Sequence, residues 1–168
     1  GAMELFRGTT AEQVVRESHR PVLVVYSTAA QPYRNACVGV DFSPSGVSAA
    51  RTVMCHFPSV ALHLVHAYHV PFSGFQSGKQ TEQQCKEEET EHMRDLVRSE
   101  IEPLCKERGG AAPEMEVIVE PGFPPAILRH TAVTLEADLL VVGTHGRTGL
   151  SRAVIGSVAA ELLVDPPC

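Results

Sequence analysis

The sequence contains no long apolar run, no excess of positive charge and no closely spaced cysteine pair. No apolar stretch approaches about 18 residues, so we expect no membrane-spanning helix and no membrane partner. The formal net charge of −6 argues against nucleic acid as a partner, because such a surface needs a basic face. The five cysteines form no Cys-x-x-Cys pair, which is typical of free thiols in a reducing compartment and predicts a cytoplasmic protein.

Within these limits the chain has the composition of an ordinary globular domain. It has 168 residues, of which 43% are hydrophobic and 20% charged. That length is enough for one α/β domain with a sizeable core. Residues 1–3 resemble a tag-cleavage remnant and are left out of the fold prediction.

Short apolar segments alternate with segments of helical periodicity along most of the chain. The alternation predicts right-handed βαβ crossovers and therefore an open, mainly parallel sheet with helices on both faces. The strands are expected at 37–41, 60–70, 116–120 and 139–143, and the helices from Ser43, over 81–108, after Pro124 and over 152–164.

Local signals mark several helix ends. Ser43 is expected to be the N-cap of the first of these helices, with Pro44 at its first position. Pro103 is expected to kink or break the long charged helix near its end, because proline removes a backbone donor. Gly109 and Gly110 then predict its end.

The most informative pattern is a set of spaced glycines after the strand at 139–143. Gly143 is followed by Gly146 after two residues, and Gly156-Ser157 follows nine residues later. Glycine allows positive φ and close approach of the backbone to a ligand. A strand that leads into such a loop and then into a helix N-terminus can hold a phosphate with backbone N–H groups and the helix dipole. The pattern therefore predicts nucleotide binding.

Asp41 ends another predicted strand, and the carboxyl ends of parallel strands meet at one edge of a sheet. Ligands of open α/β sheets bind in the crevice at that edge, so Asp41 and Gly143 are expected to converge there. The alternative role for Asp41 is to cap the following helix.

The N-terminal part of the chain repeats a pattern from its C-terminal part. Residues 8–15 resemble residues 156–163, and the two segments are 148 residues apart. After the first copy comes the β-branched segment 20–25, whereas no strand follows the second. We therefore interpret 4–26 as the last helix and strand of a preceding repeat, 27–36 as a linker and 37–168 as a domain without its final strand.

These residues resemble the universal stress protein family, in its nucleotide-binding branch. The resemblance rests on the glycine pattern from Gly143 to Ser157, on Val-Gly-Val-Asp-Phe-Ser-Pro at 38–44, on the strand at 137–143 and on the turn at 122–127. It implies a Rossmann-like, five-stranded sheet of order 3-2-1-4-5. It also suggests a fragment of a tandem two-domain protein.

The resemblance implies an ATP site, with AMP or cyclic AMP as alternatives. Asp41 would lie near the adenine and ribose, and Val65 would flank the adenine. The ribose and phosphates would be lined by the glycine loop, with arginines placed to screen the phosphate charge: Gly143, His145, Gly146, Arg147, Arg152, Gly156 and Ser157. Mg²⁺ or Mn²⁺ would be held through the phosphates rather than by a protein cage.

The missing final strand departs from the family pattern, in which that strand is the sheet edge and the usual dimer contact. We expect Pro21–Val25 to cover the edge beside 139–142, either from the same chain or from the partner in a homodimer. An uncovered edge would favour aggregation.

Three histidines on or after one strand, His63, His66 and His69, raise the alternative of a metal site. Strand periodicity places His66 on the face opposite the other two, so we expect no metal ligation.

The expected function is regulation in a stress response through nucleotide binding and dimerisation. No general base is evident near the glycine loop apart from Asp41 and His145, so hydrolysis of ATP is expected to be slow at most. The alternatives are a true adenine-nucleotide enzyme and an interaction module with a vestigial site.

Overall fold

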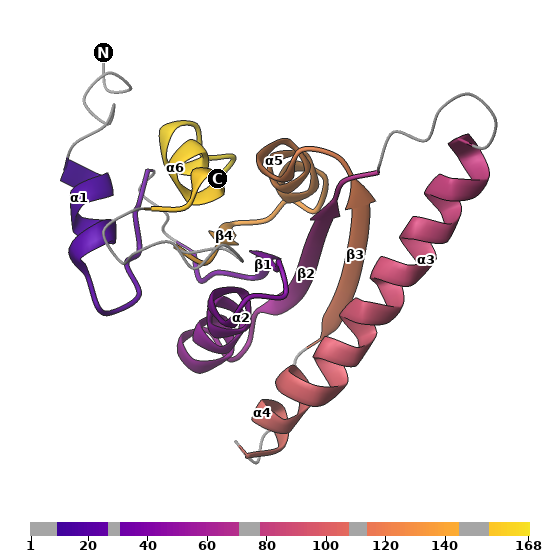
Figure 1. Cartoon of the computed structure of the whole chain (residues 1–168). Coiled ribbons are helices and arrows are strands. Elements are labelled where there is room, and N and C mark those ends of the chain that lie inside the picture. The colour runs from indigo at the N-terminus through magenta and orange to yellow at the C-terminus, as the bar shows by residue number, and fades with distance from the viewer. Residues whose placement is uncertain (1–9, 27–30, 71–77, 108–113, 145–154) are drawn as a thin grey trace.

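The computed structural model describes residues 10–26, 31–70, 78–107, 114–144 and 155–168. The structure alternates strands and helices along the chain (Figure 1). Its elements are α1 (Thr10–Glu17), β1 (Asn35–Gly39), α2 (Pro44–His56), β2 (Ala61–Tyr68), α3 (Gly78–Leu96), a π-helical turn η1 (Val97–Ile101), α4 (Glu102–Glu107), β3 (Met115–Pro121), α5 (Pro124–Thr134), β4 (Leu139–Val141) and α6 (Ser157–Val164).

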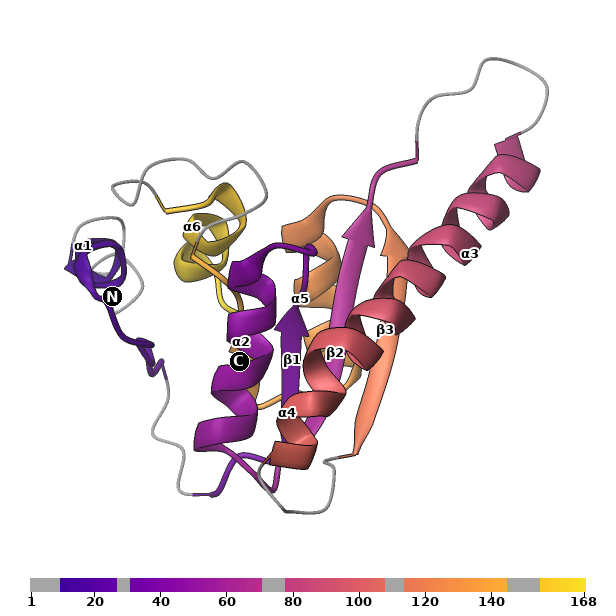
Figure 2. The ribbon, with the colours of Figure 1, turned by 60° about the horizontal axis from the view of Figure 1, so that its bottom comes forward.

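The described strands form one parallel sheet of order β3-β2-β1-β4. In its register Val38 of β1 lies opposite Leu64 of β2 on one side and Val141 of β4 on the other. All strands therefore end at the same edge, which lies at the top in Figure 2. This confirms the predicted α/β fold with a parallel sheet.

Helices cover both faces of the sheet (Figure 2). On one face α2, α3, η1 and α4 pack over a large apolar cluster that includes Leu62, Leu64, Met93 and Ile101. On the other face α5 and α6 close a smaller cluster around Cys37, which is fully buried. The two clusters hold β1 and β2 in the centre of the molecule and fix the position of their carboxyl ends.

The long charged helix does not continue as a regular α-helix to its end. Between α3 and α4 the chain forms the π turn η1, and the backbone N–H of Glu102 bonds to the carbonyl of Val97. Pro103 follows directly. Because proline has no N–H and its ring clashes with the carbonyl four residues earlier, a widened turn before it relieves both problems. The predicted break at Pro103 therefore takes the form of this π turn.

Several predicted boundaries were wrong by a few residues. β1 begins at Asn35 and ends at Gly39, so Asp41 lies in the following loop rather than at the strand end. β4 ends at Val141, because its pairing with β1 stops where Val141 lies opposite Val38. The last helix begins at Ser157, and Ile155 and Gly156 before it are not helical.

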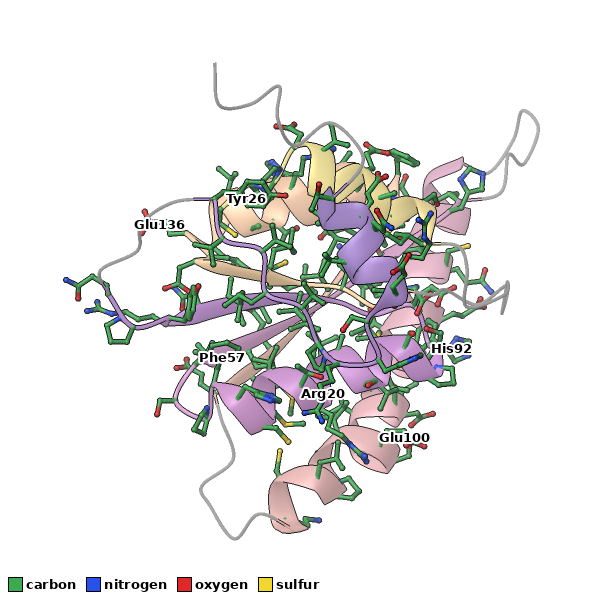
Figure 3. All side chains as sticks on the ribbon, turned by 90° about the vertical axis from the view of Figure 1, so that its left-hand side faces the viewer. Arg20, Tyr26, Phe57, His92, Glu100 and Glu136 are labelled. Atoms are coloured by element: carbon green, nitrogen blue, oxygen red, sulfur yellow. The ribbon has the colours of Figure 1, made fainter. Side chains whose placement is uncertain are left out.

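The predicted fifth strand was also wrong for this chain: Pro21–Val25 forms no strand, and the sheet of the described residues has four strands. The N-terminal segment lies against α6 instead: the hydroxyl of Tyr26, which is labelled in Figure 3, donates to the carbonyl of Leu163 at 2.7 Å. The edge of β4 is approached by the C-terminal Cys168. The pKa of its thiol is raised, first by burial and then by Asp138, and a hydrogen bond with the Leu140 backbone opposes the rise.

The two segments of the internal repeat adopt the same local structure. Residues 10–15 of the first copy belong to α1, and residues 157–163 of the second belong to α6. The two helices lie side by side (Figure 1). None of the described helices is long and apolar enough to cross a membrane.

Candidate functional site

Three segments meet at the carboxyl edge of the sheet. They are the loop after β1, the N-terminal turn of α2 and the segment that leads from β4 to α6. Gly46 of α2 lies against Asp41, and Gly143 lies against Ser45. Thr144 and Gly156 are joined by a hydrogen bond. The predicted convergence of Asp41 with Gly143 is therefore present in the fold.

Asp41 is half-buried, and its side chain organises the start of α2. Its Oδ1 accepts a hydrogen bond from the backbone N–H of Ser43 at 3.1 Å and another from the Ser43 hydroxyl. The Ser43 oxygen in turn accepts from the N–H of Gly46 at 3.2 Å, as expected of an N-cap. Asp41 therefore orients the N-cap residue Ser43 and does not itself cap α2, so the alternative capping role of Asp41 is not borne out. These hydrogen bonds do not exhaust the carboxylate, which offers about four acceptor positions on two oxygens.

Gly46 and Gly143 allow these segments to approach closely. A Cβ on Gly46 would lie 3.2 Å from both the backbone nitrogen and Oδ1 of Asp41. A Cβ on Gly143 would lie 2.7 Å from the Cβ of Ser45 and 3.0 Å from its carbonyl carbon. The absence of a side chain at Gly143 therefore serves packing against α2, in addition to any contact with a ligand.

A backbone hydrogen bond joins the two ends of the segment between β4 and α6. The backbone N–H of Gly156 donates to the carbonyl of Thr144 at 2.7 Å. This N–H is therefore occupied, and the donors of α6 that remain for a ligand begin with the exposed Ser157 at the first position of the helix. His145, Gly146, Arg147 and Arg152 lie outside the described residues.

Val65 occupies a different environment from the other predicted site residues. Its side chain is 1% exposed and belongs to the cluster closed by α5 and α6. Its carbonyl accepts from the backbone N–H of Val40 at 2.9 Å, one residue before Asp41. Contact of Val65 with an adenine ring stays a prediction.

A buried histidine lies next to the Asp41 loop, and its contacts there were not predicted from the sequence. His66 is 4% exposed, and its Nδ1 lies 2.7 Å from the carbonyl oxygen of Val40. Its ring packs on that of Phe42 with a centroid separation of 4.4 Å. Strand periodicity correctly separated its direction from that of His63, but it gave no sign of these contacts. Among the described residues no group of His, Cys, Asp and Glu side chains could hold a metal ion.

A cavity of about 350 Å³ borders the same loop, between α2 and the end of α3. It combines apolar walls with opposite charges from Arg51 on α2 and Glu100 on η1, the latter labelled in Figure 3. It is lined by Phe42, Ser43, Pro44, Val47, Ser48, Arg51, Leu96 and Glu100.

Comparisons with curated proteins and with solved structures both find universal stress proteins. The universal stress protein E homolog of Haemophilus influenzae is 40% identical over 50 residues, which are 30% of this chain and 16% of that protein. The match thus spans only a small part of the relative's length.

Among solved structures, UspA of Lactobacillus plantarum aligns with a TM-score of 0.61 and 20% identity, over 82% of this chain and 95% of that one. A universal stress family protein of Burkholderia pseudomallei aligns with a TM-score of 0.55 and 19% identity, over 83% and 95% of the two chains. At such identities the likeness concerns the fold. The family model of the universal stress proteins matches residues 32–168, and the chain therefore belongs to the universal stress protein family.

Proposed function

We propose that this chain binds an adenine nucleotide, ATP with Mg²⁺ or Mn²⁺ in the first place, at the carboxyl edge of its sheet. The observation that carries the proposal is the convergence of Asp41, Gly143 and the start of α6 at that edge. Ligands of open α/β sheets bind at this position. The nucleotide acts as a regulatory signal in a stress response.

The phosphates would occupy the region in front of α6. The N–H groups of its first turn point away from the helix and carry its positive dipole end. Ser157 lies there and is exposed, so a phosphate oxygen can reach it. Gly146, Arg147, Arg152 and His145 precede this turn in the sequence. The arginines would screen the phosphate charge, and the metal ion would bridge phosphate oxygens.

Asp41 would hold the nucleoside end. One of its oxygens is engaged by Ser43, and the remaining acceptor positions can receive a ribose hydroxyl. A hydrogen bond to a charged group contributes about 1.5–3 kcal/mol. Loss of the charge at Asp41 should therefore weaken binding about tenfold or more.

We expect slow hydrolysis of ATP at most. Efficient phosphoryl transfer needs a positioned water and neutralisation of charge, and Asp41 would hold the nucleoside end rather than activate a water at the phosphates. AMP and cyclic AMP remain alternative ligands, because the glycine loop reads phosphate and ribose more than the number of phosphates. A true nucleotide hydrolase and an interaction module with a vestigial site are the competing functions.

We also propose that the protein acts as a homodimer in the cytoplasm. All five cysteines are free, in keeping with a reducing compartment. Val22, Leu23 and Val25 are 37%, 53% and 56% exposed, so the segment 21–25 presents an apolar surface that a second copy of the chain could cover. The short match to longer relatives supports the further proposal that this chain is part of a tandem protein. Sedimentation velocity of the native chain and of Leu23→Asp tests the dimer, which this substitution should dissociate.

The nucleotide proposal is tested by isothermal titration of the chain with ATP–Mg²⁺, AMP and cyclic AMP. The native chain should bind at least one of them saturably, and Asp41→Asn should weaken that binding about tenfold or more. Absence of saturable binding would contradict the proposal and favour the vestigial site.

Asp138→Asn is the matched control. Asp138 also accepts hydrogen bonds from backbone N–H groups, those of Arg34 at 2.8 Å and Asn35 at 3.0 Å. It precedes β4, however, and lies at the opposite edge of the sheet. Equal losses in both variants would indicate general destabilisation rather than a site at Asp41.

A further inference from the structure

His66 contacts both neighbours of Asp41 in the chain. On the side of Val40 its Nδ1 lies 2.7 Å from the backbone carbonyl oxygen. A carbonyl oxygen can only accept, so Nδ1 carries the proton and donates. Val40 and His66 are both 4% exposed, and loss of this donor would leave a buried carbonyl with one partner fewer. The hydrogen bond therefore fixes the backbone directly before Asp41.

On the other side of Asp41, the ring of His66 packs on Phe42. The centroids are 4.4 Å apart and the rings are inclined by 52°. Phe42 has a φ of +59°, in the left-handed region that a bulky side chain rarely adopts. Such a conformation is strained and needs support from its surroundings. The ring contact provides that support directly after Asp41.

Helix α3 closes this cluster from the outer side. The Nε2 of His66 lies 3.6 Å from Oε2 of Glu89, and the same oxygen lies 3.7 Å from Nδ1 of His92. The ring of His92, labelled in Figure 3, meets Phe42 edge to face with centroids 6.1 Å apart. His66 is thus held between the loop and α3, and it links the position of the loop to that helix.

We propose that His66 is a positioning residue of the nucleotide site: it holds residues 40–42 so that the Asp41 carboxylate faces the ligand. The inference rests on the proposed nucleotide function. His66 acts through Asp41 and does not itself contact the nucleotide.

Two substitutions separate the contributions of the ring and of the donor. His66→Phe keeps an aromatic ring against Phe42 and removes the donor to Val40. His66→Asn places an amide N–H at about the position of Nδ1 and removes the ring. We expect His66→Phe to lower the affinity for ATP–Mg²⁺ about fivefold or more, because the buried carbonyl of Val40 loses a donor. His66→Asn keeps that donor and should lower the affinity less, by up to about threefold for the lost ring contact.

His63→Phe is the matched control. His63 lies on the same strand and also pairs with a carboxylate, through an Nδ1–Oε2 distance of 2.9 Å to Glu116. Its side chain points to the opposite face of β2. This variant should bind ATP–Mg²⁺ as the native chain does. Circular dichroism of every variant confirms that it is folded.

Combining His66→Phe with Asp41→Asn distinguishes a positioning role of His66 from a purely structural one. If His66 acts through Asp41, His66→Phe should cause no more than a twofold further loss once Asp41 is replaced. Additive losses would overturn the proposal, as would native affinity in a folded His66→Phe variant. If that variant does not fold, Phe42→Ala takes its place. It should weaken binding at least threefold by itself and cause no further loss when it is combined with Asp41→Asn. Additive losses from these two substitutions would overturn the proposal. If the native chain binds no nucleotide, both this proposal and the proposed function fail.

Discussion

Gly143, after β4, lies directly against Ser45 in the first turn of α2, so that a Cβ at residue 143 would lie 2.7 Å from the Cβ of Ser45. Real Cβ atoms do not approach other atoms so closely. Gly143, the first glycine of the loop motif, therefore lets the end of β4 contact α2, whose N-terminal turn is organised by Asp41.

Gly143→Ala should displace α2 from β4. Forcing an extra methyl group into a packed contact costs about 1–3 kcal/mol, and urea unfolding should report a loss of that size. ATP affinity should fall in the folded variant, since Asp41 moves with α2.

Ser45→Gly should partly rescue that variant. It removes the nearest clashing atom but leaves the Ser45 carbonyl carbon and oxygen, at 3.0 and 3.1 Å. Recovery of some but not all of the lost stability is therefore expected, and no recovery at all would show that the contact is unimportant.

Removal of the hydroxyl group should stabilise the fold at Tyr68 and destabilise it at Tyr26. Tyr68 is 5% exposed, and its hydroxyl has no hydrogen-bond partner among the described residues. Tyr68→Phe should therefore raise the free energy of unfolding by about 1–3 kcal/mol. Tyr26→Phe loses the 2.7 Å hydrogen bond to Leu163 and should lower it by about 0.5–1.5 kcal/mol. Thermal unfolding of the two variants measures both effects. A loss of stability in Tyr68→Phe would show that the Tyr68 hydroxyl has a hydrogen-bond partner.

Cys37 should be the least reactive cysteine. Its side chain is fully buried, and burial, together with the nearby Cys168, raises the pKa of its thiol to about 12. The thiolate is the reactive form, so very little of it exists near neutral pH. Iodoacetamide labelling followed by mass spectrometry should modify the exposed Cys55 early and Cys37 only on unfolding. Early labelling of Cys37 in the folded chain would contradict its burial.

The same thiol should make the fold less stable in alkali. Between the ordinary pKa of 9.0 and the native value of about 12, the unfolded chain has lost a proton that the native chain still holds. Stability therefore falls as pH rises through this window, by at most about 1.4 kcal/mol per pH unit from this group. Urea unfolding from pH 8 to 11 should give a shallower decline for Cys37→Ala than for Cys55→Ala. Identical slopes would exclude Cys37 as a cause.

The sequence predicted elements whose signals are local. Ser43 and Pro44 mark the start of α2 through capping and fixed φ, and both act within one turn of the helix. Pro103 likewise acts on the turn before it. These predictions depend on a few neighbouring residues, so they could be made without knowledge of the fold.

Features that depend on distant contacts could not be predicted in this way. The β-branched segment 21–25 reads as a strand, but pairing depends on what else reaches the edge of β4, where Cys168 lies. His66 was seen only as one of three histidines, because its partners come from the β1 loop and from α3. The role of Asp41 was left open for the same reason: its contacts with Ser43 and Gly46 become apparent only when the loop is folded.

The most direct test of the nucleotide site is amide chemical-shift mapping of the isotope-labelled chain with ATP–Mg²⁺. Saturable shifts are expected at the carboxyl edge, for Asp41, Ser43, Gly143 and Ser157, with little change at Arg34 and Asp138 at the opposite edge. No saturable shift, or shifts centred on Arg34 and Asp138, would contradict the proposed nucleotide site.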